Sequence, residues 1–165
     1  SEITHLNQDC IDACVFTNLL LYKIVHGRRN LAPDAILRQS IAAALEQVNF
    51  DPDFRTEIEL APVRLREDLP NTGWVRHTLE SALWAVLTTQ SFEEALIQAV
   101  NLGNDADTTG AVAGAIAGAL YGHSGIPTRW KNVLHGEYPL KSHHIWIEKD
   151  FVDLADKLAA LSPQN

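Results

Sequence analysis

Apolar residues recur every three to four positions along most of the chain, which is the spacing of a helix that buries one face. This spacing predicts helices over residues 9–25, 33–48, 53–61, 74–87, 92–103, 110–122, 126–134 and 150–161. No segment alternates apolar and polar residues between turn signals, as a half-buried strand would. The sequence therefore predicts an all-α fold in which residues 1–165 form one compact domain.

Several residues at the predicted helix boundaries support this division. Pro33 suits the first turn of a helix, and Ser91 followed three residues later by Glu94 has the pattern of a capping box. Asp150 is predicted to cap the last helix. Residues 62–73 carry charges and prolines, so we expect a solvated loop that ends in a turn.

The first predicted helix carries the only two cysteines of the chain, Cys10 and Cys14. Two thiols four residues apart are half of a metal site, but no second pair exists to complete a zinc site. We therefore expect two buried, reduced thiols on one helix face, as is typical of a cytoplasmic protein. The apolar stripe of this helix runs through Ile11, Cys14, Val15, Leu19, Tyr22 and Val25.

Composition excludes several classes of protein. A chain of 165 residues with 46% hydrophobic residues is expected to fold rather than to remain disordered. The net charge of −8 argues against a non-specific nucleic-acid binder, which needs a basic face, but it leaves room for a nucleotide-like ligand held by a metal ion. The longest apolar run, residues 111–121, is shorter than the ~20 residues that span a bilayer. We expect neither a nucleic-acid partner nor a membrane partner.

The most distinctive stretch is an acidic turn, NLGNDADTTG at residues 101–110. Asp105, Asp107 and Thr108 offer oxygen ligands of the kind that a hard cation such as Mg²⁺ prefers. Asp and Thr are also favoured at helix N-termini, so capping alone explains the composition equally well. The second acid favours a metal site, and so do Gly103 and Asn104, which permit a sharp bend.

The helix after this turn is built of small apolar residues and carries a glycine at every fourth position. These glycines fall near one stripe, so a neighbouring backbone can approach closely. Each glycine costs roughly 1 kcal/mol of helix stability relative to alanine. We therefore expect a tightly packed neighbouring helix over Gly110, Gly114, Gly118 and Gly122.

Residues 102–122, LGNDADTTGAVAGAIAGALYG, followed by Ile126-Pro127 and Trp130, resemble the C-terminal signature of the ADP-ribosylglycohydrolase family. The segment ITH at residues 3–5 looks like the Thr-His segment of that family, and NTGWV at residues 71–75 looks like the segment before its last motif. The resemblance extends from residue 3 to about residue 135. The acidic motif with its glycine-striped helix is highly specific, whereas the other two segments are informative only in that order.

The resemblance implies an all-α hydrolase, folded as a compact orthogonal bundle of helices, that uses two Mg²⁺ or Mn²⁺ ions. Such an enzyme cleaves the glycosidic bond between ADP-ribose and its acceptor, an ADP-ribosylated protein or a small molecule. Carried over residue by residue, the resemblance makes Asp105, Asp107 and Thr108 metal ligands. It makes His5, Gly73, Trp74 and Asn104 candidates for substrate binding. For Trp74, a role as an interfacial core aromatic is about as well supported.

Two departures from the family pattern qualify this interpretation. The family usually has Gly-Gly before the first acid, and this chain has Gly103-Asn104, although Asn tolerates left-handed backbone angles. The Thr-Asp-Asp metal motif and the acid/base carboxylate of the family's N-terminal half have no counterpart here, so the catalytic residues are unknown. The chain resembles the C-terminal half alone. Two alternatives follow: a second chain or a lost segment supplies the missing half, or this chain is an inactive binding or scaffold module. We expect the isolated chain to be inactive or nearly so.

Overall fold

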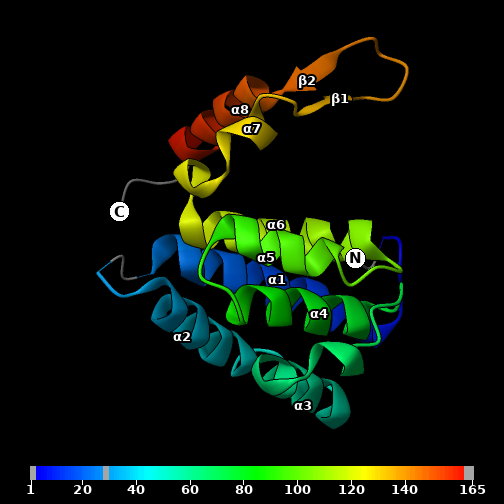
Figure 1. Cartoon of the computed structure of the whole chain (residues 1–165). Coiled ribbons are helices and arrows are strands. Elements are labelled where there is room, and N and C mark those ends of the chain that lie inside the picture. The colour runs from blue at the N-terminus through cyan, green and yellow to red at the C-terminus, as the bar shows by residue number, and fades with distance from the viewer. Residues whose placement is uncertain (1–2, 28–29, 162–165) are drawn as a thin grey trace. The chain divides into compact units, whose positions relative to one another are not determined.

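The computed structural model describes residues 3–27 and 30–161, and the described chain is mainly helical with a small two-stranded sheet, which confirms the all-α prediction (Figure 1). It divides into two compact units, one up to Gly125 and one from Ile126, and each is described separately. The prediction of a single domain stays a prediction. The first unit contains α1 (Gln8–His26), α2 (Pro33–Leu45), α3 (Pro52–Leu60), α4 (Val75–Leu87), α5 (Phe92–Val100) and α6 (Ala106–Tyr121), with 3-10 turns at Ala61–Val63, Arg66–Asp68 and His123–Gly125.

Helix α4 is the centre of the first unit. It packs against α1, α3, α5 and α6, and every residue from Thr78 to Leu87 is buried. Helix α2 packs on α1, and α5 and α6 lie side by side (Figure 1). Two predicted start signals are confirmed. Pro33 begins α2, and the Ser91 hydroxyl accepts a hydrogen bond from the Glu94 amide at 3.1 Å.

The second unit contains a feature that the sequence pattern did not predict. A helix was expected over residues 126–134, but α7 spans only Thr128–Lys131 and is followed by an antiparallel hairpin of β1 (His135–Glu137) and β2 (Ile145–Ile147). Strands of three residues are too short for an alternating pattern to be recognised. Helix α8 (Glu148–Leu161) begins two residues before the expected cap. Asp150 therefore lies within its first turn, where the carboxylate accepts a hydrogen bond from the Ile147 amide at 2.9 Å.

Helix α1 buries a different face from the one predicted. Ala13, Phe16, Leu20 and Ile24 form its buried side, together with Asp12. Four residues of the predicted stripe are exposed instead, because α1 is apolar on two sides and periodicity alone does not say which side meets the core: Cys14, Val15, Tyr22 and Val25. Both thiols are free, as expected, but Cys14 is exposed and Cys10 is only partly buried, so the prediction of buried thiols was wrong.

We expected a tightly packed neighbouring helix over the glycines of α6, and three of these glycines face α5. The space above each glycine is occupied by a side chain rather than by the backbone of α5. A Cβ atom added to these glycines would lie 3.1, 3.7 and 3.9 Å from side-chain atoms of α5, in the pairs Gly110 with Val100, Gly114 with Leu96 and Gly118 with Phe92. Gly122 instead ends the helix in a left-handed conformation, with φ of 71°.

Alanine at Gly114 is expected to stabilise the protein by about 1 kcal/mol, because a Cβ there makes only ordinary contact with Leu96 and the helix gains propensity. Alanine at Gly110 is expected to gain less, because Val100 must first give way. In a Val100→Ala background the full gain should return at Gly110. Urea denaturation of the single and double variants measures this coupling, and equal gains at the two glycines in the wild-type background would contradict it.

The segment predicted as a solvated loop has a structural role. Arg64 Nε donates to Glu80 Oε1 at 2.7 Å, and the Glu80 side chain is only 3% exposed. The carbonyl of Arg64 accepts from the indole nitrogen of Trp84 at 3.1 Å. Asn71, near the end of the segment, is also buried. The Arg64 contacts hold the first part of the segment against α4, which its charges and prolines did not indicate.

Glu57 on α3 has a buried carboxylate oxygen that accepts no hydrogen bond within the described part of the chain. Burial raises the pKa of Glu57 above its ordinary value, and the nearby positive charge of Arg76 opposes this rise. The folded protein therefore binds this proton more tightly than the unfolded chain does. Stability is favoured where Glu57 is protonated and falls as pH rises from the ordinary carboxyl value through the raised one.

Glu57→Gln is accordingly expected to raise Tm at pH 7, and the gain should vanish near pH 3, below the ordinary carboxyl value, where both states of the wild type are protonated. Thermal melts followed by circular dichroism across this range test the prediction. Glu59→Gln, on the exposed side of the same helix, is the matched control and should change Tm little. A gain that is equal at both pH values would show that charge burial is not its cause.

Candidate functional site

The acidic turn connects α5 to α6 and bends through two consecutive left-handed residues. Gly103 has φ of 77° and Asn104 has φ of 51°. Asn is one of the few residues other than glycine that adopts this conformation readily. The turn is therefore compatible with Asn104 in the place where the family pattern has glycine.

Asn71 holds this turn in place from a distant segment. Its side chain is 1% exposed, and its amide nitrogen donates to the carbonyl oxygen of Gly103. Its amide oxygen accepts from the hydroxyl of Thr109, which is itself fully buried. One buried amide thus joins the turn to the first turns of α6. Sequence reasoning placed Asn71 in a turn but missed this role.

Asp105 occupies the N-cap position of α6, but its side chain makes no capping hydrogen bond to the helix backbone. Its Oδ1 atom instead accepts from the Thr108 hydroxyl at 2.9 Å. Its Oδ2 atom lies 3.4 Å from the point where a Cβ on Gly73 would stand, so the two segments approach closely here. The structure therefore brings Asp105, Thr108 and Gly73 together.

Asp107 lies exposed in the first turn of α6. Two carboxylates and a hydroxyl within one helical turn are the right donor chemistry for Mg²⁺ or Mn²⁺. They are too few to enclose an ion, and across residues 3–27 and 30–161 no group of three or more His, Cys, Asp or Glu side chains is arranged to hold a metal. The donor chemistry of these residues would suit one side of a metal site, for which the remaining ligands would have to come from elsewhere.

Trp74 caps the N-terminus of α4 and is 46% exposed, so it is not a core aromatic. Its ring lies 4.7 Å from that of His77, at an angle of 76°. The Thr72 hydroxyl accepts from the Trp74 amide at 3.3 Å and is hydrogen-bonded to His77 Nδ1 at 2.7 Å. Trp74 is adjacent in sequence to Gly73, which approaches Asp105.

His5 lies exposed ahead of α1, and its Nδ1 atom is hydrogen-bonded to the Thr4 hydroxyl at 3.1 Å. This hydrogen bond is local and does not link His5 to the acidic turn. The proposed substrate-binding roles of His5, Gly73, Trp74 and Asn104 stay predictions, as do the metal-binding roles of Asp105, Asp107 and Thr108.

Comparison with known proteins gives a consistent result. The family model for ADP-ribosylglycohydrolase matches residues 1–165. The chain is 49% identical over 136 residues to an ADP-ribosylarginine hydrolase Tri1 of Serratia proteamaculans (strain 568), which covers 81% of this chain and 34% of that relative. It is 33% identical over 130 residues to the protein of the same name from Pseudomonas putida (strain GB-1), which covers 79% of this chain and 33% of the relative.

An ADP-ribosyl-[dinitrogen reductase] glycohydrolase of Rhodospirillum rubrum is 29% identical over 134 residues, covering 81% of this chain and 40% of the relative. The matched part of the chain thus spans between a third and two fifths of the length of these relatives. The match of the family model to the whole chain, together with these identities, shows that the chain belongs to the ADP-ribosylglycohydrolase family.

Proposed function

We propose that this chain supplies one side of the metal and ADP-ribose site of a hydrolase that removes ADP-ribose from an acceptor. ADP-ribosylarginine is the first acceptor to test, because two of the relatives are named as hydrolases of it. We further infer a cytoplasmic location from the two free cysteines. No described helix is long and apolar enough to cross a membrane.

The observation that supports this function best is the orientation of Asp105. A carboxylate retained only to cap α6 would accept a hydrogen bond from the helix backbone, as Ser91 does at the start of α5. Asp105 makes no such bond and lies beside Thr108 and Gly73 instead. Capping alone therefore does not explain the acid, whereas a ligand role does.

A bound Mg²⁺ or Mn²⁺ pair would neutralise substrate oxygens and activate water. Asp105, Asp107 and Thr108 would hold it from the α6 side, and the left-handed turn at Gly103 and Asn104 would fix their approach. The facing ligands and the general acid/base would come from a second chain or from a segment outside these residues. The isolated chain is therefore expected to bind ions weakly and to hydrolyse little.

Mn²⁺ binding, followed by electron paramagnetic resonance, and ADP-ribose release from ADP-ribosylarginine test this proposal together. Weak Mn²⁺ binding that is lost in Asp105→Asn and in Asp107→Asn is expected. Asp34→Asn, which also removes an exposed first-turn carboxylate, should leave binding unchanged. No difference among these variants would favour an inactive scaffold of the same fold, whereas strong hydrolysis by the isolated chain that is lost in Asp107→Ala would overturn the idea of a partial site.

A further inference from the structure

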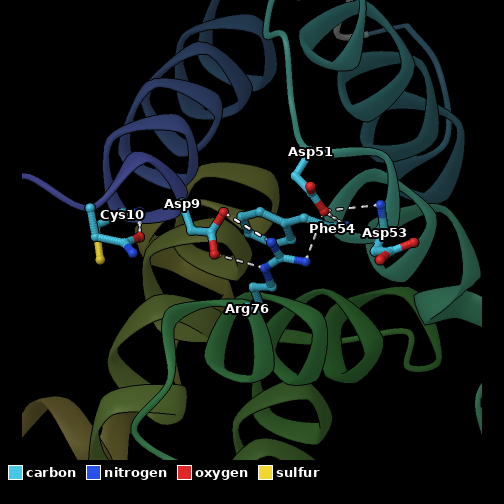
Figure 2. Close-up of polar contacts among 7 residues, drawn as sticks. Asp9, Cys10, Asp51, Asp53, Phe54 and Arg76 are labelled. Carbon is cyan, nitrogen blue, oxygen red and sulfur yellow. Dashed lines mark hydrogen bonds and ion pairs between the residues drawn. The ribbon is translucent and has the colours of Figure 1, made fainter.

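Arg76, two residues beyond Trp74, forms ion pairs with two carboxylates in the first unit. Its Nε and Nη2 atoms donate to the two oxygens of Asp9 at 2.8 and 3.1 Å (Figure 2). Its Nη1 atom donates to Asp51, the N-cap residue of α3, at 3.1 Å. Three helices are joined at this point, because Asp9 lies in the first turn of α1 and Arg76 in the first turn of α4.

The guanidinium also lies against two aromatic rings. Its central carbon is 5.1 Å from the ring centre of Phe54 and 5.1 Å from that of Trp74. The Arg76 side chain is only 13% exposed, and a cation held over an indole in such surroundings attracts the ring. The ring of His77 also contacts Trp74, at an angle of 76°. Trp74 is therefore held by two neighbours, while almost half of its surface stays exposed.

The charges around Arg76 argue against a role as an anchor for substrate phosphates. Each of its three nitrogens already donates to a carboxylate, and two carboxylates face the single cation. The hydrogen bond to Asp9 raises the pKa of Arg76, so this group stays charged and paired. Three of its five N–H groups are used in these bonds. A diphosphate approaching the cluster would meet a local net charge of about −1, because Asp9 and Asp51 together outweigh the single cation.

We propose that Arg76 is a positioning residue that holds Trp74 as a stacking platform for a planar base of the substrate, and that it does not bind the phosphates. This inference rests on the proposed function, since it assigns the open surface of Trp74 to the base of ADP-ribose. Two observations support it. Arg76 lies directly over the indole of Trp74. Gly73, which precedes Trp74 in the sequence, approaches Asp105 closely. A base stacked on Trp74 would thereby lie one residue along the chain from the segment that approaches Asp105.

The first test uses the full chain labelled with 5-fluorotryptophan, in which Trp74→Phe identifies the fluorine resonance of Trp74. In Arg76→Met that resonance should shift and broaden, and Arg76→Lys should restore it in part by keeping the cation. The double variant Asp9→Asn/Arg76→Met removes the charges of Asp9 and Arg76 together, so it leaves no unpaired Asp9 carboxylate that could unfold the protein. Arg38→Met, which removes an exposed cation paired with Asp34, is the control. An unchanged Trp74 resonance in Arg76→Met would overturn the proposal.

The second test measures binding of ADP-ribose and of adenosine, each with Mg²⁺, by calorimetry. Arg76→Met should weaken both ligands equally, by roughly tenfold, which corresponds to the lower part of the range for losing a base stacked on an aromatic ring. A loss that is much greater for ADP-ribose than for adenosine would identify Arg76 as a phosphate ligand and overturn the proposal. If the wild-type chain binds neither ligand, the proposed function and the platform fail together, while the fluorine resonance still decides whether Arg76 positions Trp74.

Discussion

Asn71→Ala is expected to lower the free energy of unfolding by about 3 kcal/mol, because it leaves the buried hydroxyl of Thr109 without its acceptor and also removes the hydrogen bond to the carbonyl of Gly103. An unsatisfied buried polar group costs about 1–3 kcal/mol. For a chain of this length the loss corresponds to a fall in Tm of roughly 10 °C. Urea denaturation and calorimetry measure both quantities.

Asn49→Ala is the matched control, since Asn49 is exposed and its replacement should change stability by less than about 0.5 kcal/mol. Thr109→Val removes the other end of one hydrogen bond, so the double variant Asn71→Ala/Thr109→Val should lose less than the sum of the single variants. Strict additivity, or a loss below about 1 kcal/mol in Asn71→Ala, would show that this amide does not hold the acidic turn.

Arg64→Met is expected to cost about 3 kcal/mol, because it leaves the carboxylate of Glu80 buried and unpaired. Arg64 is one-third exposed, so water reaches part of the vacated space and keeps the loss at the lower end for a buried pair. The carbonyl of Arg64 keeps its bond to Trp84, which isolates the effect of the side chain. Chemical denaturation at pH 7 measures the loss.

The double variant Arg64→Met/Glu80→Met should recover most of the stability, because two apolar side chains replace the pair and leave no charge unpaired. Arg38→Met is the control, because its partner Asp34 is nearly half exposed and a surface pair contributes little. A double variant as unstable as Arg64→Met would show that shape, rather than charge, is what the pair contributes.

Much of the helical framework was predictable from local signals. Pro33 and the Ser91–Glu94 box begin helices where the pattern placed them, because these signals act within one helical turn. The buried face of α1 was not predictable, since Phe16 and Tyr22 lie on opposite apolar sides and only the packing of other helices decides between them. The hairpin of the second unit was not predicted, because each of its strands spans only three residues.

The candidate site was predictable in part for a similar reason. The oxygen donors Asp105, Asp107 and Thr108 follow one another in the sequence, so their proximity is local. The role of Asn71 was not predictable, because it depends on a hydrogen bond to Thr109, which lies 38 residues away in the sequence. Arg76 escaped because its partner Asp9 lies 67 residues away. Tertiary contacts of single polar residues leave no periodic pattern to read.

The repeat on α6 has a consequence for alignment. Glycines at every fourth position face large side chains at every fourth position of α5, so a slide of four residues, about 6 Å, would bring equivalent shapes into contact again. The apolar surface therefore specifies the distance between the helices but only weakly their register. The register is set at one end, by the short turn and by the amide of Asn71 that bridges Gly103 and Thr109. The same polar contact that shapes the candidate site therefore also sets the register between α5 and α6.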